Sequence, residues 1–247
     1  MGEIMRTPLL SFLLLGAFSF AGCASSTPGA QPHDMSSAQH EAMAANEEKT
    51  AQVHTTQYNP NASVKTERCS RGGRARAEVD GGCWTSVTNP TAEHLEEAKK
   101  HHKMAADHRG ASQALRDAEA RACIGISDED RDESPFEHRE DIASVEPLTV
   151  GTTSGKSQNV RTEGAVVTFR AVPGMTAQWL QRVVDCHLAR NAALGHDVPE
   201  MAYCPLVPKD VTAKVTATTS GFAVAVRSDN TETAKEVLKR ARTRVVR

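Results

Sequence analysis

Two stretches of the N-terminal half, residues 36–57 and 91–122, are rich in residues that favour the α-helix. In the second stretch, Asn89-Pro90-Thr91 followed by Glu93 is a typical helix start. Its apolar positions recur on one face, as a seam of Leu95, Ala98 and Ala105. The pattern predicts two long helices, the second ending near residue 123.

The C-terminal half contains an internal repeat, offset by 57 residues from Gly164 to Gly221. Each copy has a glycine, a short β run that ends in Arg, a turn, and Thr-Ala opening an amphipathic helix. A further β run precedes each copy, over 145–150 and 211–218. We expect two ββα units that form an antiparallel four-stranded sheet with two helices, or a ferredoxin-like arrangement if one strand shifts. The predicted fold class is α+β: a long-helix pair followed by this small sheet.

An apolar stretch of 14 residues, 9–22, follows Arg6 near the N-terminus. A bilayer-spanning helix needs about 20 residues, so this length is typical of a signal peptide instead. The stretch ends in Phe20-Ala21-Gly22-Cys23, which resembles the lipobox of bacterial lipoproteins, with Phe20 at the usual Leu position. The resemblance implies a signal peptide over 1–22, starting at Met1 or Met5, and lipid modification of Cys23.

Several acyl chains on Cys23, palmitate among them, would anchor the chain stably in a lipid bilayer. Ala24 is not the Asp that favours inner-membrane retention in enterobacterial lipoproteins. The resemblance therefore implies a cell-envelope location, the outer membrane rather than the inner one where the host has two. Residues 23–35, small and polar with Pro and Gly, predict a flexible tether.

The remaining organisation is a helical region over 36–125, an acidic linker over 126–141 and an α+β domain over 142–247. Among the 247 residues, 39% are hydrophobic, and the net charge of −2 argues against a nucleic-acid partner. Residues 150–157 are similar to a phosphate-binding loop, but one residue is missing between the glycines and no helix follows. We therefore expect no nucleotide.

Five cysteines remain after Cys23, and outside the cytoplasm they are disulfide candidates. Each of two pairs flanks an irregular stretch that a disulfide would stabilise: Cys69 with Cys83, and Cys186 with Cys204. Cys123 is then left over, either free and buried or exchanging with a member of the first pair.

Both predicted helices carry a polar stripe at helical spacing, with Glu47 and Glu97 beside His and Met. In an antiparallel pair, His40 faces His108, Met43 faces Met104, Glu47 faces His101 and His54 faces His94. Imidazole, thioether and carboxylate groups together suit Cu or Zn. The candidate metal ligands are His40, Met43, His54, His94, His101, Met104 and His108. Two alternatives stay open, a solvated polar stripe and a surface that responds to pH.

A second set of soft ligands follows the first helix of the repeat: Cys186, His187, His196, Met201 and Cys204. The alternative is a Cys186–Cys204 disulfide with two surface histidines. The stretch from Cys204-Pro205-Leu206 to Arg244 resembles C-terminal modules of uncharacterised bacterial envelope proteins, a resemblance that implies no activity.

The sequence predicts a membrane-anchored exported lipoprotein with a non-enzymatic structural or interaction role, whose partners are the lipid bilayer and other envelope proteins. The alternative is a Cu- or Zn-binding lipoprotein that uses the helical stripes; no other cofactor is expected. The sequence has no GxSxG, HExxH or Ser-His-Asp arrangement, so we do not expect an enzyme.

Overall fold

The computed structural model describes residues 27–69, 82–154 and 157–243 of the chain. As the sequence predicts, the protein is α+β. It has two antiparallel sheets, of two and four strands, and the two-stranded sheet is one that the sequence did not predict. The elements in chain order are η1 (Pro32–Asp34), α1 (Ser37–Gln57), β1 (Val64–Cys69), β2 (Cys83–Thr88), α2 (Ala92–Ala122), α3 (Asp128–Asp132), η2 (Arg139–Asp141), β3 (Ile142–Ser154), β4 (Ser157–Arg170), α4 (Ala177–Ala193), η3 (Pro199–Met201), β5 (Thr212–Thr218), β6 (Gly221–Arg227) and α5 (Thr231–Thr243).

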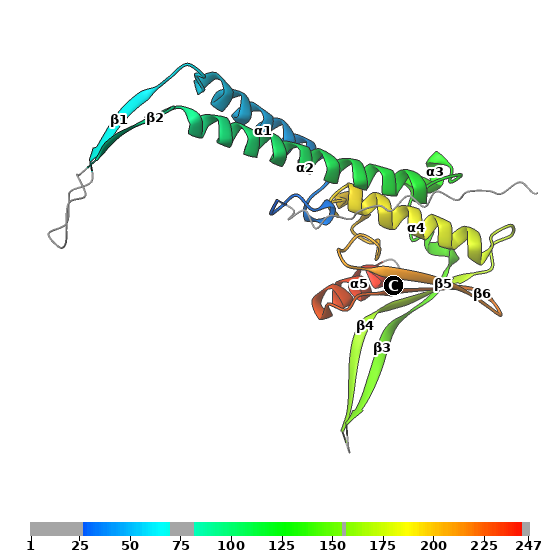
Figure 1. Ribbon diagram of the computed structural model, residues 1–247. Helices are drawn as coiled ribbons and strands as arrows, with labels where there is room; N and C mark the ends of the chain where they lie inside the picture. The colour runs from blue at the N-terminus through cyan, green and yellow to red at the C-terminus, as the bar shows by residue number, and fades with distance from the viewer. Residues whose placement is uncertain (1–26, 70–81, 155–156, 244–247) are drawn as a thin grey trace, which may run out of the picture.

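Helices α1 and α2 lie side by side and antiparallel, and β1 and β2 continue from them as a two-stranded arm (Figure 1). Ser36 caps α1 by accepting a hydrogen bond from the Gln39 backbone N–H, and the Gln39 side chain accepts one from the Ser36 N–H. Between the helices the buried apolar side chains are small, with Ala44, Ala51, Ala98 and Ala105 all at most 3% exposed. The helical hairpin therefore has a thin apolar core.

The four-stranded sheet has the strand order β3-β4-β6-β5, and the elements around it alternate as two strand–strand–helix units. The repeated segments of the sequence are its two central strands. Their register places each repeat glycine opposite the other repeat's arginine, Gly164 against Arg227 and Gly221 against Arg170. The sequence repeat thus forms a local two-fold arrangement at the centre of the sheet.

The two repeat glycines are required by the backbone. Both have positive φ, +149° at Gly164 and +150° at Gly221. A Cβ atom at Gly164 would lie 1.9 Å from the carbonyl oxygen of Val226, and one at Gly221 would lie 2.0 Å from that of Phe169. Only glycine permits this close approach of neighbouring strands.

One face of the sheet carries the main hydrophobic core. Val167 of β4 and Val224 of β6 pack in one cluster with Leu180 of α4 and Val237 of α5. Phe136 belongs to the same cluster and is 2% exposed. Residues 126–141 were expected to be a linker, but they fold against α4 because Phe136 anchors them in this core.

Strands β3 and β4 extend past the sheet as a second arm (Figure 1). The register shifts at Leu148/Thr149 of β3, which leaves Glu163 of β4 as an extra residue in a bulge. The pairing of β4 with β6 ends at Gly164, so strand residues before the bulge pair with β3 alone. Residues 150–154 and 157 belong to these strands, and no helix follows them.

Residues 27–35 pack against the folded part of the chain. Ala30 is 7% exposed, and Thr27 donates a 2.5 Å hydrogen bond to Asp107 of α2. At the end of α4, a Cβ on Gly195 would lie 2.8 Å from Ser36 Cβ, so the chain passes close to that turn. The expectation of a flexible tether is thus wrong for residues 27–35, while residues 23–26 lie outside the described residues. Among the described helices, none combines the length and apolarity that crossing a bilayer requires.

Candidate functional site

The polar stripes of α1 and α2 meet as three cross-helix contacts, which we call the rungs. His40 Nδ1 lies 3.1 Å from His108 Nδ1, and His54 Nδ1 lies 3.2 Å from His94 Nδ1. Between them, His101 Nδ1 lies 2.5 Å from Glu47 Oε2. These are three of the four cross-helix pairs that the sequence pattern predicts.

The rungs alternate with the alanine layers along the hairpin. From one end to the other, the order is His40/His108, Ala44 and Ala105, Glu47/His101, Ala51 and Ala98, His54/His94. On each helix the rung residues recur every seven positions, the heptad spacing that keeps one face toward an antiparallel partner. Small apolar layers let the helices approach closely enough for the polar side chains to bond across them.

The hydrogen bonds of the His40–His108 rung fix its protonation pattern. His40 Nε2 lies 3.0 Å from the carbonyl oxygen of Gln31, and a carbonyl only accepts, so this nitrogen carries a hydrogen. In neutral His40, Nδ1 is then the acceptor, and His108 Nδ1 is the donor. His40 and His108 are 0% and 3% exposed.

Each of the two His–His rungs offers two metal-ligand nitrogens. Two nitrogens bound to one tetrahedral Zn²⁺ at about 2.0–2.1 Å lie about 3.3 Å apart, close to the 3.1 and 3.2 Å of the two His–His rungs. Among the described residues, however, no His, Cys, Asp or Glu completes either rung to a three-ligand cluster. Each His–His rung thus supplies two of the four ligands of a tetrahedral site.

The other proposed ligands of the stripes lie outside the rungs. Met43 is 38% exposed and lines a shallow surface cavity with Gln39 and Lys209. Met104 is half-buried on α2. Glu97 forms an ion pair with Lys100, 3.2 Å apart, and its carboxylate is 4.0 Å from His101 Nε2. No thioether joins a described rung.

A three-ligand cluster does occur in the β1–β2 arm, where Glu67, Cys69 and Cys83 converge at the surface. Cys69 and Cys83 are bonded to each other, as the sequence predicts. A disulfide sulfur is not the thiolate that binds metals, so this cluster is a disulfide with a neighbouring carboxylate rather than a metal centre.

The prediction for the other cysteines is wrong. Cys123 at the end of α2 is bonded to Cys186 of α4, and among the cysteines that the structure describes Cys204 is the free one. The Cys204 thiol is fully buried and accepts a 3.2 Å hydrogen bond from Ser134 Oγ, while burial raises its pKa. Cys186 faces α2 rather than its own following loop, so the disulfide joins the helical hairpin to the α+β domain.

The soft-ligand set around Cys186 does not form a metal site, because its members have other partners. His187 Nε2 donates to the carbonyl oxygens of Asp130 and Glu133, at 2.9 and 3.0 Å. His196 Nδ1 donates to the carbonyl oxygen of Val207, at 2.8 Å. Burial lowers the pKa of both histidines, which act as neutral structural donors.

Sequence reasoning missed a cavity of about 210 Å³ between the segment 129–141, the end of β4 and the start of α4. We call it the acidic cavity. Its floor is apolar, with Phe169 and Leu180 buried and Trp179 half-buried. Four acidic residues line it, Glu129, Asp130, Glu133 and Asp141, together with His138.

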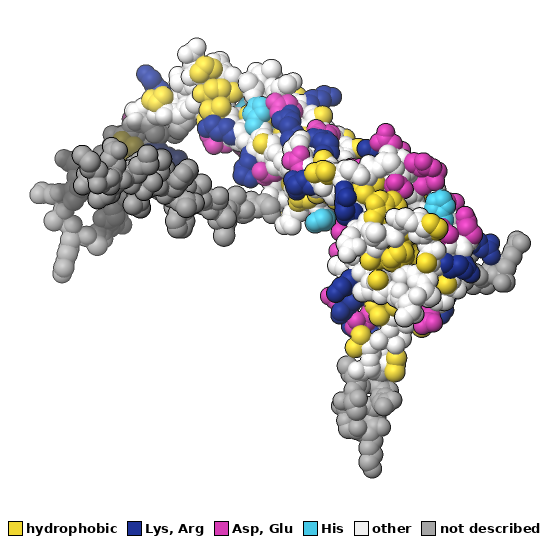
Figure 2. Space-filling view, turned by 90° about the vertical axis from the view of Figure 1, so that its right-hand side faces the viewer, with side chains coloured by type: hydrophobic (Ala, Val, Ile, Leu, Met, Phe, Trp, Pro, Cys, Tyr) yellow, Lys and Arg dark blue, Asp and Glu magenta, His cyan; other side chains and the backbone are white. Residues whose placement is uncertain are grey.

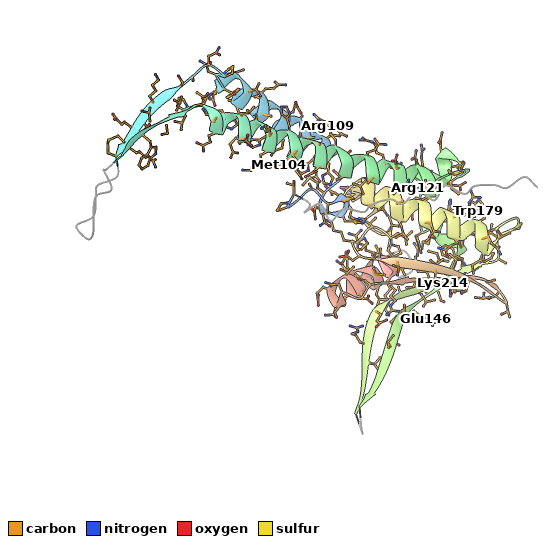
Figure 3. The ribbon with its side chains drawn as sticks, in the orientation of Figure 1. Met104, Arg109, Arg121, Glu146, Trp179 and Lys214 are labelled. Atoms are coloured by element: carbon orange, nitrogen blue, oxygen red, sulfur yellow. A yellow bond between two sulfur atoms is a disulfide. The ribbon has the colours of Figure 1, made fainter. Side chains whose placement is uncertain are left out.

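The same combination is visible on the surface. Figure 2 shows Asp and Glu side chains and a histidine gathered beside a hydrophobic patch, on the end of the molecule where α3 lies in Figure 1. Trp179 lies near the start of α4 at this end (Figure 3). The acidic composition of residues 127–132 signalled the rim, but the apolar floor comes from β4 and α4.

Comparison with protein-family models, with curated proteins and with solved structures finds no match to this chain. Residues 1–22, predicted to be a signal peptide, and Cys23 lie outside the described residues. The site therefore rests on the geometry of the described residues alone.

Proposed function

We propose that the chain is a membrane-anchored, exported lipoprotein with a non-enzymatic interaction role in the cell envelope. The observation that carries the proposal is the pair of hairpin arms that project from the folded body with apolar side chains exposed. Trp84 and Val87 in the β1–β2 arm are 55% and 61% exposed, and Val160 in the β3–β4 arm is 67% exposed. Exposed apolar side chains on projecting strands are typical of surfaces that bind other proteins.

Two further observations support the proposal. Two disulfides favour an oxidising compartment, which agrees with the lipobox-like ending at Cys23. The titratable side chains of the rungs bond to one another between two helices rather than facing a cavity. This arrangement favours a structural or binding role over catalysis.

Membrane anchoring is tested by fractionating cells that express the wild-type chain or Cys23→Ser. We expect the variant to move from the membrane to the soluble fraction, whereas Cys204→Ser, a control that removes a buried thiol, stays with the membrane. Retention of Cys23→Ser in the membrane fraction would contradict the proposed anchor.

Interaction through the arms is tested by placing a photocrosslinking residue at Trp84 or Val160, with Lys99 on the exposed face of α2 as the control position. We expect discrete crosslinked species from the arm positions and none from the control. Equal patterns from all three positions would contradict an arm-mediated interaction.

A second candidate, transition-metal binding by the rungs, is favoured by the spacing of the His–His nitrogens. Titration of the mature chain with Cu(I), Cu(II) or Zn(II) tests it. An ion bound by the native state and present at about 100 times its Kd adds roughly 2.7 kcal/mol of stability. The gain should fall in His54→Phe and stay unchanged in His138→Gln. An unchanged Tm with every ion would rule this candidate out.

A further inference from the structure

We infer that the acidic cavity binds a cationic side chain, an arginine presented by a separate partner protein. The inference deepens the proposed interaction role, on which it rests, by naming the chemistry of the partner. It depends on four properties of the cavity: unpaired negative charge, an apolar floor, a small volume and a fixed rim.

The four rim carboxylates have no cationic partner among the described residues. Glu129, Asp130, Glu133 and Asp141 take part in none of the ion pairs found there, unlike Asp132, which pairs with Arg190 at 2.9 Å. His138 also lines the cavity, and its Nδ1 lies 3.9 Å from the carboxylate of Glu140, which is outside the rim. Nearby arginines are otherwise engaged or face elsewhere. Arg170 donates to the carbonyl oxygens of Glu140 and Ile142. Arg139 is exposed and does not line the cavity. The cavity thus concentrates negative charge that an incoming cation would neutralise.

The floor matches the stem of the same side chain. Met175 and Trp179 form half-buried walls above the buried Phe169 and Leu180. An arginine buries its aliphatic stem against apolar surface while its head reaches polar groups. Its planar guanidinium also stacks on aromatic rings and bonds to carboxylates in pairs, which an ammonium cannot do.

The size of the cavity indicates a single side chain. Sites for drug-sized ligands are about 300–1,000 Å³, and this cavity is about 210 Å³. A larger organic cation would leave most of its surface outside. A side chain anchored on a protein partner, by contrast, gains further contacts around the rim.

The rim is held in place before any ligand arrives. The buried His187 binds the carbonyl oxygens of Asp130 and Glu133, and Ser127 Oγ accepts from the Asp130 backbone N–H. These bonds fix the turn that carries three of the four carboxylates. A preorganised rim lowers the entropic cost of binding.

The test uses the purified mature chain and an acetyl-Gly-Leu-Arg-Leu-Gly-amide peptide, with a peptide carrying citrulline, a neutral isostere of arginine, as the control. Binding is followed by Trp fluorescence in the Trp84→Phe background, which reports Trp179. We expect saturable binding of the arginine peptide and at least tenfold weaker binding of the citrulline peptide.

The matched variants are a cavity triple, Glu129→Gln, Glu133→Gln and Asp141→Asn, and a control triple with the same charge change elsewhere, Glu96→Gln, Asp117→Asn and Glu232→Gln. The cavity triple should bind at least tenfold more weakly and the control triple like wild type. Equal binding of both peptides, or of both triples, would overturn the inference.

Sedimentation velocity of the purified chain tests whether the cavity binds a second copy of this chain instead. Self-association that the cavity triple abolishes would assign the cavity to a second copy of this chain and overturn the separate partner. Since the peptide assay does not involve the arms, its failure leaves arm-mediated interaction standing, and the crosslinking experiment decides that point separately.

Discussion

The helical hairpin and the α+β domain are stabilised in opposite ways. The hairpin has a thin alanine core crossed by polar rungs, whereas the domain packs Val, Leu and Phe into one apolar cluster. Apolar packing is tolerant of similar shapes, but a buried polar pair requires a specific partner. The comparison indicates that the rungs fix the register of the hairpin, and packing supplies most of the stability of the domain.

The largest loss in the free energy of unfolding is expected in the α+β domain, from substitutions of the two repeat glycines. Gly164→Ala and Gly221→Ala each place a Cβ about 2 Å from a main-chain oxygen, so each should lower the free energy of unfolding by about 4 kcal/mol or more. Urea denaturation measures the loss. The control Gly151→Ala has no heavy atom within 4 Å of the new Cβ and should change little. A loss near the average for point mutants, about 1 kcal/mol, would contradict the strand geometry.

Removing the disulfide that links the two regions should cause the next largest loss in the free energy of unfolding. The Cys123–Cys186 disulfide closes a loop with a sequence separation of 63, and removing it as Cys123→Ser with Cys186→Ala should cost about 4 kcal/mol. Thermal unfolding of this variant should separate into two transitions, one for each region.

The matched control is Cys69→Ser with Cys83→Ser, which opens the disulfide of the β1–β2 arm outside the main core. It should leave the unfolding of the domain unchanged. A single transition of wild-type midpoint after loss of Cys123–Cys186 would show that packing alone couples the regions.

A smaller loss of stability is expected from substitutions in the buried His40–His108 rung. His40→Leu leaves His108 without its partner and should cost about 1–3 kcal/mol. The double variant His40→Leu with His108→Leu removes both polar groups and should recover most of that loss. A double-mutant cycle read by denaturation measures the coupling, and additive losses would mean that the rung contributes no specific interaction.

The smallest effect is a dependence of domain stability on pH. Burial lowers the pKa of His187 and of His196 below the ordinary value of 6.5. The unfolded chain therefore binds more protons than the native state on the acid side. Stability should be full above about pH 6.5 and fall as the pH drops through and below that value. Urea titrations from pH 8 to pH 5 test the sign, and stability that rises on acidification would contradict it.

The features that the sequence predicts correctly are local or periodic. Helical spacing predicted the His40–His108 contact once the helices were taken as antiparallel, and the irregular stretch between Cys69 and Cys83 predicted their disulfide. The glycine and arginine repeat likewise predicted which strands are equivalent. Each of these follows from neighbouring residues or from one regular period.

The features that the sequence did not predict depend on how separate elements dock. Cys186 bonds to Cys123 because α4 packs against α2, and no pattern within either helix reports that packing. Residues 126–141 read as a linker by charge, yet Phe136 belongs to the core. The acidic cavity combines segments from three parts of the chain, so its apolar floor and charged rim never adjoin in the sequence.

The hairpin is joined by polar rungs, and in the buried His40–His108 rung the two Nδ1 atoms share one proton. Long-range ¹H–¹⁵N spectra of the histidine rings at neutral pH test it most directly, with His40→Gln and His108→Gln for assignment. The hydrogen bonds of this rung require opposite tautomers, a protonated Nε2 in His40 and a protonated Nδ1 in His108, with a scalar coupling between the two Nδ1 atoms. The same tautomer on both rings without that coupling would contradict it.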